Sequence, residues 1–269
     1  MSVKAMRDYY VAASRIGFQR DIQYRGATFI NILGFMIEPA IYLVVWRTVA
    51  IEQGGSVGGY TVNDFTAYYI VWTLVRVMNL AHAPYAWEWR IRGGRLNELL
   101  SIPIQPFHRD FAYFIGSKFV WILMWIPVAV VLTLTFRPQL HPQPAHVLGF
   151  LVAIWTGFAV RFLLLYLMGM ITFWTTRGQA IFDLIVAGEL LLSGRLVPLA
   201  LMPDWVQTVS NWLPFQWSFQ FPIEVAIGRL SGGEILQGFA IQVLWIAGMA
   251  FAFTRIWPRA VKNYTAVGG

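Results

Sequence analysis

The sequence contains no cysteine and carries little charge. Only 12% of its 269 residues are Asp, Glu, Lys or Arg, about half of the roughly 25% found in soluble domains. The absence of cysteine excludes disulfides, thiolate metal ligands and a cysteine nucleophile. Charge this scarce, together with a hydrophobic fraction of 58%, excludes a water-soluble globule. We therefore expect a membrane protein that lies mostly in the bilayer.

Motifs of catalytic, metal and channel sites are missing as well. The sequence has no G-x-x-x-x-G-K-[ST], so the chain is not expected to bind ATP through a P-loop, and it has no H-E-x-x-H metal motif. Its four histidines are dispersed, and the two that share a loop, His141 and His146, are too few for a structural metal site. No apolar run carries the arginine ladder of a voltage sensor. We expect no catalytic residue, no metal site and no cofactor bound by this chain.

What the sequence does contain is six apolar runs, each compatible with the roughly 20 residues of a membrane-spanning helix. They cover about Thr28–Val49, Val62–Ala83, Phe111–Phe136, Val147–Trp174, a run from Gln179 that is interrupted near Gly194, and Ile235–Phe253. Most of the 20 Lys and Arg residues, Lys118 counted among them, fall in the ends and loops of one side. The positive-inside rule assigns that side to the cytoplasm. The same rule accounts for the net charge of +7, so no nucleic-acid partner is expected.

The first 22 residues lack the continuous apolar core of a signal peptide. Apolar residues such as Met6, Tyr10 and Ala13 recur at helical spacing, with charged residues between them. This pattern predicts an amphipathic helix in residues 1–26 that lies in the membrane surface. A solvated helix packed on other protein is the alternative. The predicted fold is thus an all-α membrane protein: an interfacial helix, six transmembrane helices over residues 27–269, and both termini in the cytoplasm.

A short basic stretch, residues 87–110, follows the second apolar run. Gly93 and Gly94 precede a segment that can form a short helix, and prolines follow it. Leu96, Leu99 and Leu100 would share one face of that helix. Two interpretations are open. In the first, the helix is a docking element for a soluble partner. In the second, the stretch is an ordinary inner loop whose leucines rest on lipid or on the helical bundle.

The fifth apolar run is interrupted by prolines. Residues 190–222 contain four prolines and three tryptophans, a spacing that a straight helix would not tolerate. The pattern predicts two short helices within residues 195–222 that dip into the outer leaflet and return, with tryptophans at the interface. The alternative is a long outer loop that lies flat on the membrane.

Five of the charged residues inside the apolar runs stand out: Glu38, Arg76, Arg161, Asp183 and Glu189. Each costs several kcal/mol if it faces lipid, with disputed estimates from about 3 kcal/mol upward. We expect Arg76 and Arg161 to face the interior and to pair with carboxylates, for which Glu38 and Glu189 are the candidates. These charges line a substrate path, or they pair only to hold helices together.

These features, taken in order, resemble the membrane subunit of a type-2 ABC exporter. The most specific pieces are the inner I-R-G-G-R-L-N-E-L-L-S-I-P (Ile91–Pro103), the outer S-G-R-L-V-P-L-A-L-M-P (Ser193–Pro203) and N-W-L-P-F (Asn211–Phe215). The closing K-N-Y-T-A-V-G-G (Lys262–Gly269) resembles a bacterial subgroup whose permeases are often encoded in pairs. The charged Arg195 departs from the small or apolar residue expected in the outer turn.

The resemblance implies a permease of the bacterial inner membrane that is not itself an enzyme. Two cytoplasmic ATPase subunits would hold ATP and Mg. A second permease, more readily a related chain than a copy, would complete the path for a lipid-linked, glycan or drug-like substrate. The coupling helix would be Gly94–Ser101. The implied ATPase-coupling residues are Arg92, Gly94, Arg95, Leu96, Leu99 and Leu100. From the charges themselves we expect the translocation path to be lined by Glu38, Arg76, Arg161, Glu189 and Arg195.

Two other classes compete with this interpretation. A channel or secondary transporter that works without ATP would need a midplane ion site, usually with broken helices in both halves, and the sequence shows only one broken segment. A membrane enzyme that acts on lipids would need a nucleophile or a paired acid and base, and none stands out.

Overall fold

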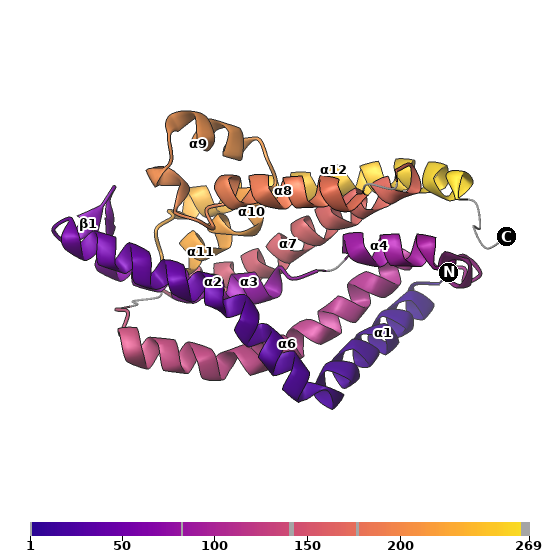
Figure 1. Cartoon of the computed structure of the whole chain (residues 1–269), viewed down its shortest axis with the longest axis horizontal. Coiled ribbons are helices and arrows are strands. Elements are labelled where there is room, and N and C mark those ends of the chain that lie inside the picture. Colours follow the sequence, from indigo (N-terminus) through magenta and orange to yellow (C-terminus); the bar gives the residue numbers. More distant parts are fainter. Residues whose placement is uncertain (1, 82, 140–142, 176–177, 265–269) are drawn as a thin grey trace.

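The computed structural model describes residues 2–81, 83–139, 143–175 and 178–264. The described chain is almost entirely helical, which confirms the predicted all-α class (Figure 1). Its elements are α1 (Val3–Gln23), α2 (Arg25–Glu52), β1 (Ser56–Val57), β2 (Tyr60–Thr61), α3 (Val62–Met78), α4 (Ala83–Arg92), α5 (Leu96–Leu100), α6 (Pro106–Phe136), α7 (Pro144–Gly169), η1 (Met170–Phe173), α8 (Gly178–Leu192), η2 (Leu199–Leu201), α9 (Asp204–Asn211), α10 (Phe215–Ser218), α11 (Gln220–Ala226) and α12 (Gly232–Asn263). His82, His141, Arg177 and the tail from position 265 onward lie outside the described residues.

Among the described residues, four helices are long and apolar enough to cross a membrane: α2, α6, α7 with η1, and α12. The other two predicted spans correspond to shorter helices. With 17 residues in α3 and 15 in α8, these helices are about 25 and 22 Å long at 1.5 Å per residue, against a hydrocarbon core of about 30 Å. The six-span topology therefore stays a prediction, and four spans follow from helix length and composition.

The second predicted span, Val62–Ala83, is wrong at its end. Helix α3 starts at a capping box, in which Thr61 and Asp64 satisfy each other's backbone N–H groups. It stops at Met78, and residues 79–81 are not helical before α4 begins. Helix α3 is also closely enclosed by the bundle, since eleven of its 17 residues are buried. The polar Asn79 ends the apolar run where the helix ends.

The segment predicted to be an amphipathic helix does form a helix, α1, which packs on the same chain; its place in the membrane surface stays a prediction. It runs side by side with the first half of α6 (Figure 1), and the Ser14 hydroxyl donates to the carbonyl of Ala112 at 2.8 Å. The two backbones approach closely because glycines face the contact. A Cβ atom on Gly116 would overlap the Ser14 carbonyl oxygen, and one on Gly17 would overlap that of Tyr113. Small residues thus set the distance between the helices.

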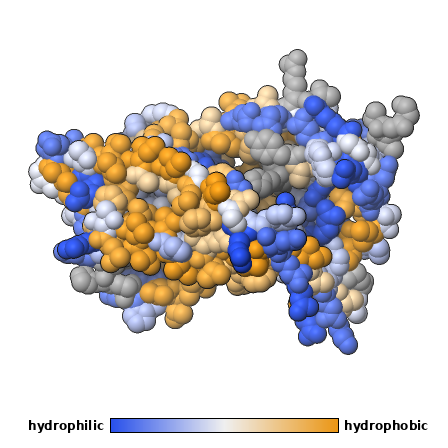
Figure 2. Space-filling view, turned by 60° about the horizontal axis from the view of Figure 1, so that its bottom comes forward, coloured by the Kyte–Doolittle hydropathy of each residue, from blue (hydrophilic) through white to orange (hydrophobic). Residues whose placement is uncertain are grey.

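The proline-rich segment after α8 folds into short helices, but it contains η2, α9, α10 and the start of α11 rather than the two helices predicted, and its entry into the outer leaflet stays a prediction. Trp205 of α9 and Trp212, which follows α9, are exposed, whereas α10 and α11 pack against α7, and Phe219 and Ile223 are buried there. The face of the molecule drawn in Figure 2 shows a broad apolar region, with hydrophilic residues gathered at one end and some at the other. This distribution fits a chain that crosses a membrane along its long axis.

Candidate functional site

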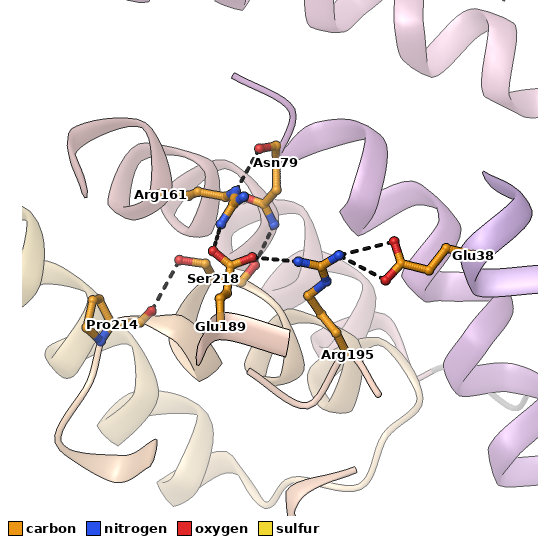
Figure 3. Close-up of polar contacts among 7 residues, drawn as sticks. All are labelled: Glu38, Asn79, Arg161, Glu189, Arg195, Pro214 and Ser218. Carbon is orange, nitrogen blue, oxygen red and sulfur yellow. Dashed lines mark hydrogen bonds and ion pairs between the residues drawn. The ribbon is translucent and has the colours of Figure 1, made fainter. Parts of the chain in front are cut away.

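A network of five charged side chains crosses the interior of the bundle. Glu38 of α2 accepts from Arg195 Nη2 at 3.0 Å and pairs with Arg76 Nη2 of α3 at 3.1 Å. Arg195 Nη1 also donates to Glu189 of α8 at 2.8 Å, and Arg161 of α7 donates to the other oxygen of Glu189. Figure 3 shows Arg195 between the two carboxylates and Glu189 between two guanidinium groups. The network thus links α2, α3, α7 and α8 through the turn that follows α8.

These five residues are the ones that the sequence analysis expects to line the translocation path. The expected pairing of Arg76 and Arg161 with Glu38 and Glu189 is confirmed, since each arginine contacts one of these carboxylates. The sequence did not assign Arg195 to this pairing, yet it bridges both carboxylates.

The fifth charge of the apolar runs, Asp183, lies apart from this network. It is exposed on α8 and accepts from the Gln179 amide one turn earlier, at 2.7 Å. Its only role visible in the described residues is this local hydrogen bond.

Three arginines face two glutamates, so the network carries one excess positive charge. Glu189 is 1% exposed and Arg195 4%, while Glu38 is 30% exposed at its side chain. Removing charges from water is costly unless they are paired and hydrogen-bonded, and each carboxylate here meets two arginines. Phe219 adds a ring face 4.9 Å from the Arg161 guanidinium and 5.4 Å from that of Arg195. Both oxygens of Glu189 are satisfied at the buried end, although Arg195 Nε is buried there without a hydrogen-bond partner among the described residues. The end at Glu38 reaches the surface.

The interrupted end of α3 is held by two cations. Lys118 Nζ donates to the carbonyls of Val77 at 3.2 Å and Leu80 at 2.6 Å, and Arg161 Nε donates to that of Asn79 at 2.9 Å. The last carbonyls of a helix lack intrahelical partners and carry partial negative charge. Positive side chains at this position therefore stabilise a helix end inside the bundle. Arg161 connects this helix end to the charged network.

Lys118 corrects a prediction. The positive-inside count places it among the cytoplasmic charges, but it lies within α6 and is fully buried. Its ammonium lies 4.0 Å from the Trp121 ring centroid, which adds a cation–π contact. The available signal was a lysine inside the apolar run that starts at Phe111. It could not be interpreted without knowing that α3 ends opposite it.

The turn after α8 is positioned by side chains of α2 and α3. Trp46 and Tyr69 both donate to the carbonyl of Leu196, at 2.8 and 2.9 Å, and Tyr68 donates to that of Gly194 at 2.7 Å. Gly194 has a φ of 79°, and a Cβ atom there would overlap the side chain of Gln220. Only glycine fits both the left-handed backbone and this contact. The turn thus holds Arg195 against the carboxylates.

The basic stretch 87–110 contains the expected short helix, α5. Leu96 and Leu99 are buried in a cluster with Trp87, Tyr166 and Phe173. Of the two open interpretations, the structure therefore supports leucines that rest on the bundle. The neighbouring Leu100 also packs against this cluster. The apolar face of α5 is consequently not available to a partner in this conformation.

The exposed face of this stretch carries charged residues, together with the exposed side chains of Trp89 and Ile102. Arg92, Arg95 and Glu98 are exposed, and Gly94 provides the left-handed turn (φ 65°) in front of α5. Arg92 pairs with Glu88 at 2.8 Å, and the Arg95 guanidinium lies 4.3 Å from the Trp89 ring centroid. The residues expected to couple to an ATPase are thus divided between a buried apolar face and an exposed charged face.

An ion pair joins α4 to the start of α6. Arg90 contacts both oxygens of Asp110, at 2.5 and 2.9 Å. Burial lowers the pKa of Arg90, but the hydrogen bonds and the charge of Asp110 outweigh it and raise the pKa above its ordinary value. Arg90 therefore stays charged, and the pair fixes the orientation of α4 relative to α6.

Comparison with known families identifies one match. The family described as ABC-2 family transporter protein matches residues 36–268. The chain belongs to the ABC-2 transporter family. The match contains every residue of the charged network and the whole of stretch 87–110. This supports a permease role for a multi-pass membrane protein.

The other comparisons gave no match, either among curated proteins or among solved structures. Within the part of the chain that the structure describes, no group of three or more His, Cys, Asp or Glu side chains is placed to hold a metal ion.

Proposed function

We propose that this chain is the permease subunit of an ATP-driven ABC exporter in the bacterial inner membrane. It would have six spans and cytoplasmic termini, and it would form half of a path for a lipid-linked, glycan or drug-like substrate. Two cytoplasmic ATPase subunits would bind ATP and Mg. A second permease, more readily a related chain than a copy, would supply the other half.

The surface end of the charged network carries this proposal. The side chains of Glu38 and Arg76 are 30% and 18% exposed, while their neighbours Ile37 and Ile41 on α2 are 60% and 54% exposed. A charged pair in an apolar band is unfavourable against lipid. It is tolerated where water or another protein covers it. A path between two permeases provides both.

The polar face of stretch 87–110 supports docking of the ATPase subunits. Arg95 and Glu98 are exposed on a segment whose leucines are fixed in the bundle. Because those leucines pack with Tyr166 of α7, a displacement of α5 would be passed to α7, which also carries Arg161. This connection gives a physical route from the docking surface to the charged network.

A transporter that works without ATP is the second candidate. The break after α3, which the sequence did not reveal, adds a second interrupted helix and favours this class. However, Lys118 and Arg161 already occupy the carbonyls at the end of α3. A transported cation would have to displace them, which makes the ABC exporter the better supported function.

Purification of the tagged chain from native membranes in mild detergent, with identification of bound proteins by mass, tests the proposal. We expect an ATPase with a P-loop and a second permease. Glu98→Lys should weaken retention of the ATPase, and Glu52→Lys, the same change at the exposed end of α2, should not. If no ATPase is retained in several detergents, the exporter proposal is wrong and the second candidate replaces it.

A further inference from the structure

A cavity of about 530 Å³ lies between α1, α4 and α6. Three arginines line it, one from each helix: Arg20, Arg90 and Arg109. Asp110, the acidic residue of the lining, is already paired with Arg90 at both oxygens. The lining therefore carries an excess of two positive charges, at Arg20 and Arg109. A ligand that neutralises this excess would be anionic.

The remaining walls of this cavity are apolar or aromatic and include Ile16, Tyr113 and Phe114. Arg20 Nη1 donates to the Tyr113 hydroxyl at 2.6 Å, which uses one of the five N–H donors of a guanidinium group. The Arg109 side chain is 40% exposed and contacts Asp110 at 3.5 Å. Both arginines thus retain donors that can reach a ligand oxygen.

A second cavity of about 630 Å³ shares Arg20, Tyr113 and Phe114 with the first. It continues between α1, α2 and α6 along apolar side chains such as Ile32. Ser117 also lines it, and its hydroxyl is buried without a hydrogen-bond partner among the described residues. A buried hydroxyl without a partner is unfavourable. A ligand with an acceptor oxygen beside an apolar chain would satisfy it.

Asp21 is the acidic residue that lines the second cavity. Its carboxylate accepts from the Trp121 indole N–H at 2.8 Å, and the residue is 8% exposed. An anionic group would be repelled by this carboxylate. The anionic part of a shared ligand therefore belongs in the first cavity, and the uncharged part in the second.

From this arrangement we propose that the two cavities bind one anionic phospholipid, whose phosphate contacts Arg20 and Arg109. Its ester region would accept from Ser117, and an acyl chain would lie along the second cavity. The inference rests on the proposed spans. Arg20 lies shortly before the start of α2, and Arg109 lies in the first turn of α6. Both therefore lie at head-group depth, where basic pockets between helices bind anionic lipids.

Native mass spectrometry of the delipidated permease complex, titrated with phosphatidylglycerol, tests this proposal. We expect a defined bound lipid, and we expect Arg20→Gln and Arg109→Gln each to weaken binding by about fivefold. Arg15→Gln removes the same charge from an exposed position of α1 and should leave binding unchanged. Arg20→Lys should keep most of the affinity.

Several outcomes would overturn the proposal. Equal loss in Arg15→Gln and Arg20→Gln would mean non-specific attraction to anionic lipid. Equal binding of phosphatidylcholine would mean a neutral lipid site, and competition by inorganic phosphate would mean a site for the free anion. If Arg20→Gln does not fold, Ser117→Ala and Arg109→Gln carry the test. If the variants still retain the ATPase, a failure to bind lipid would contradict the lipid site and leave the proposed permease function intact.

Discussion

Arg195 Nη2 lies 3.0 Å from Glu38 Oε1, although 157 positions separate the two residues in the chain. The contact joins the turn after α8 to the middle of α2. Because Arg195 also contacts Glu189, one guanidinium group connects the exposed end of the network to its buried end. Removal of the Glu189 carboxylate should therefore mainly lower stability, whereas removal of the Glu38 carboxylate should mainly reduce transport.

Glu189→Gln should destabilise the fold. The substitution leaves Arg161 and Arg195 buried without their shared carboxylate, and breaking a buried ion pair costs about 3–5 kcal/mol. We expect a clearly lower Tm for the detergent-purified protein. Asp183→Asn, the same chemical change at an exposed position of α8, is the control and should leave Tm unchanged. Equal Tm values for the two variants would contradict a structural role for Glu189.

Glu38→Gln should affect transport more than stability. Glu38 is the most exposed member of the network, and Arg195 keeps Glu189 as a partner when the Glu38 carboxylate is removed, so the cost should lie below the roughly 3–5 kcal/mol of a broken buried pair. We expect a smaller fall in Tm than in Glu189→Gln, retained ATPase and reduced transport in membrane vesicles. A marked fall in Tm with normal transport per folded molecule would instead show that this end of the network is only structural.

Lys118→Met should loosen the end of α3. The carbonyls of Val77 and Leu80 would lose their donor, at a cost of about 1–3 kcal/mol for each buried group left unsatisfied. A lower Tm and faster hydrogen exchange in residues 75–81 are expected. Lys4→Met, on the exposed face of α1, should change neither. Unaltered exchange in Lys118→Met would refute the proposed stabilisation of this helix end.

Gly116→Leu should separate α1 from α6. There is no space for a side chain beside Ser14, and overpacking costs about 1–3 kcal/mol. We expect α1 to detach and trypsin to cleave it about tenfold faster, the factor that 1.4 kcal/mol represents. Gly248→Leu, at a position with open space, is the control. Equal cleavage rates in both variants would argue against close packing as the reason for glycine here.

The members of the charged network could be predicted from the sequence more successfully than its geometry. Charges in apolar runs are visible in any sequence, and their cost in lipid requires partners. The partners themselves could not be assigned, since Glu38 could pair with any arginine at a similar depth. Arg195 is predictable as a residue of the path and as an unusual charge in the outer turn, but not as the bridge between the carboxylates, because that role depends on the turn that Tyr68, Tyr69 and Trp46 hold in place.

Composition and local backbone preference are enough to predict the class of the protein, the helical apolar runs and the break at the prolines after α8. Three further features depend on packing between helices: α3 stops at Met78, Lys118 is buried at its end, and the leucines of α5 face inward. Each depends on which side chain lies opposite a given position. A helix end can remain inside an apolar bundle only when a donor from another helix reaches its carbonyls, and the distance between two helices along the chain does not reveal that contact.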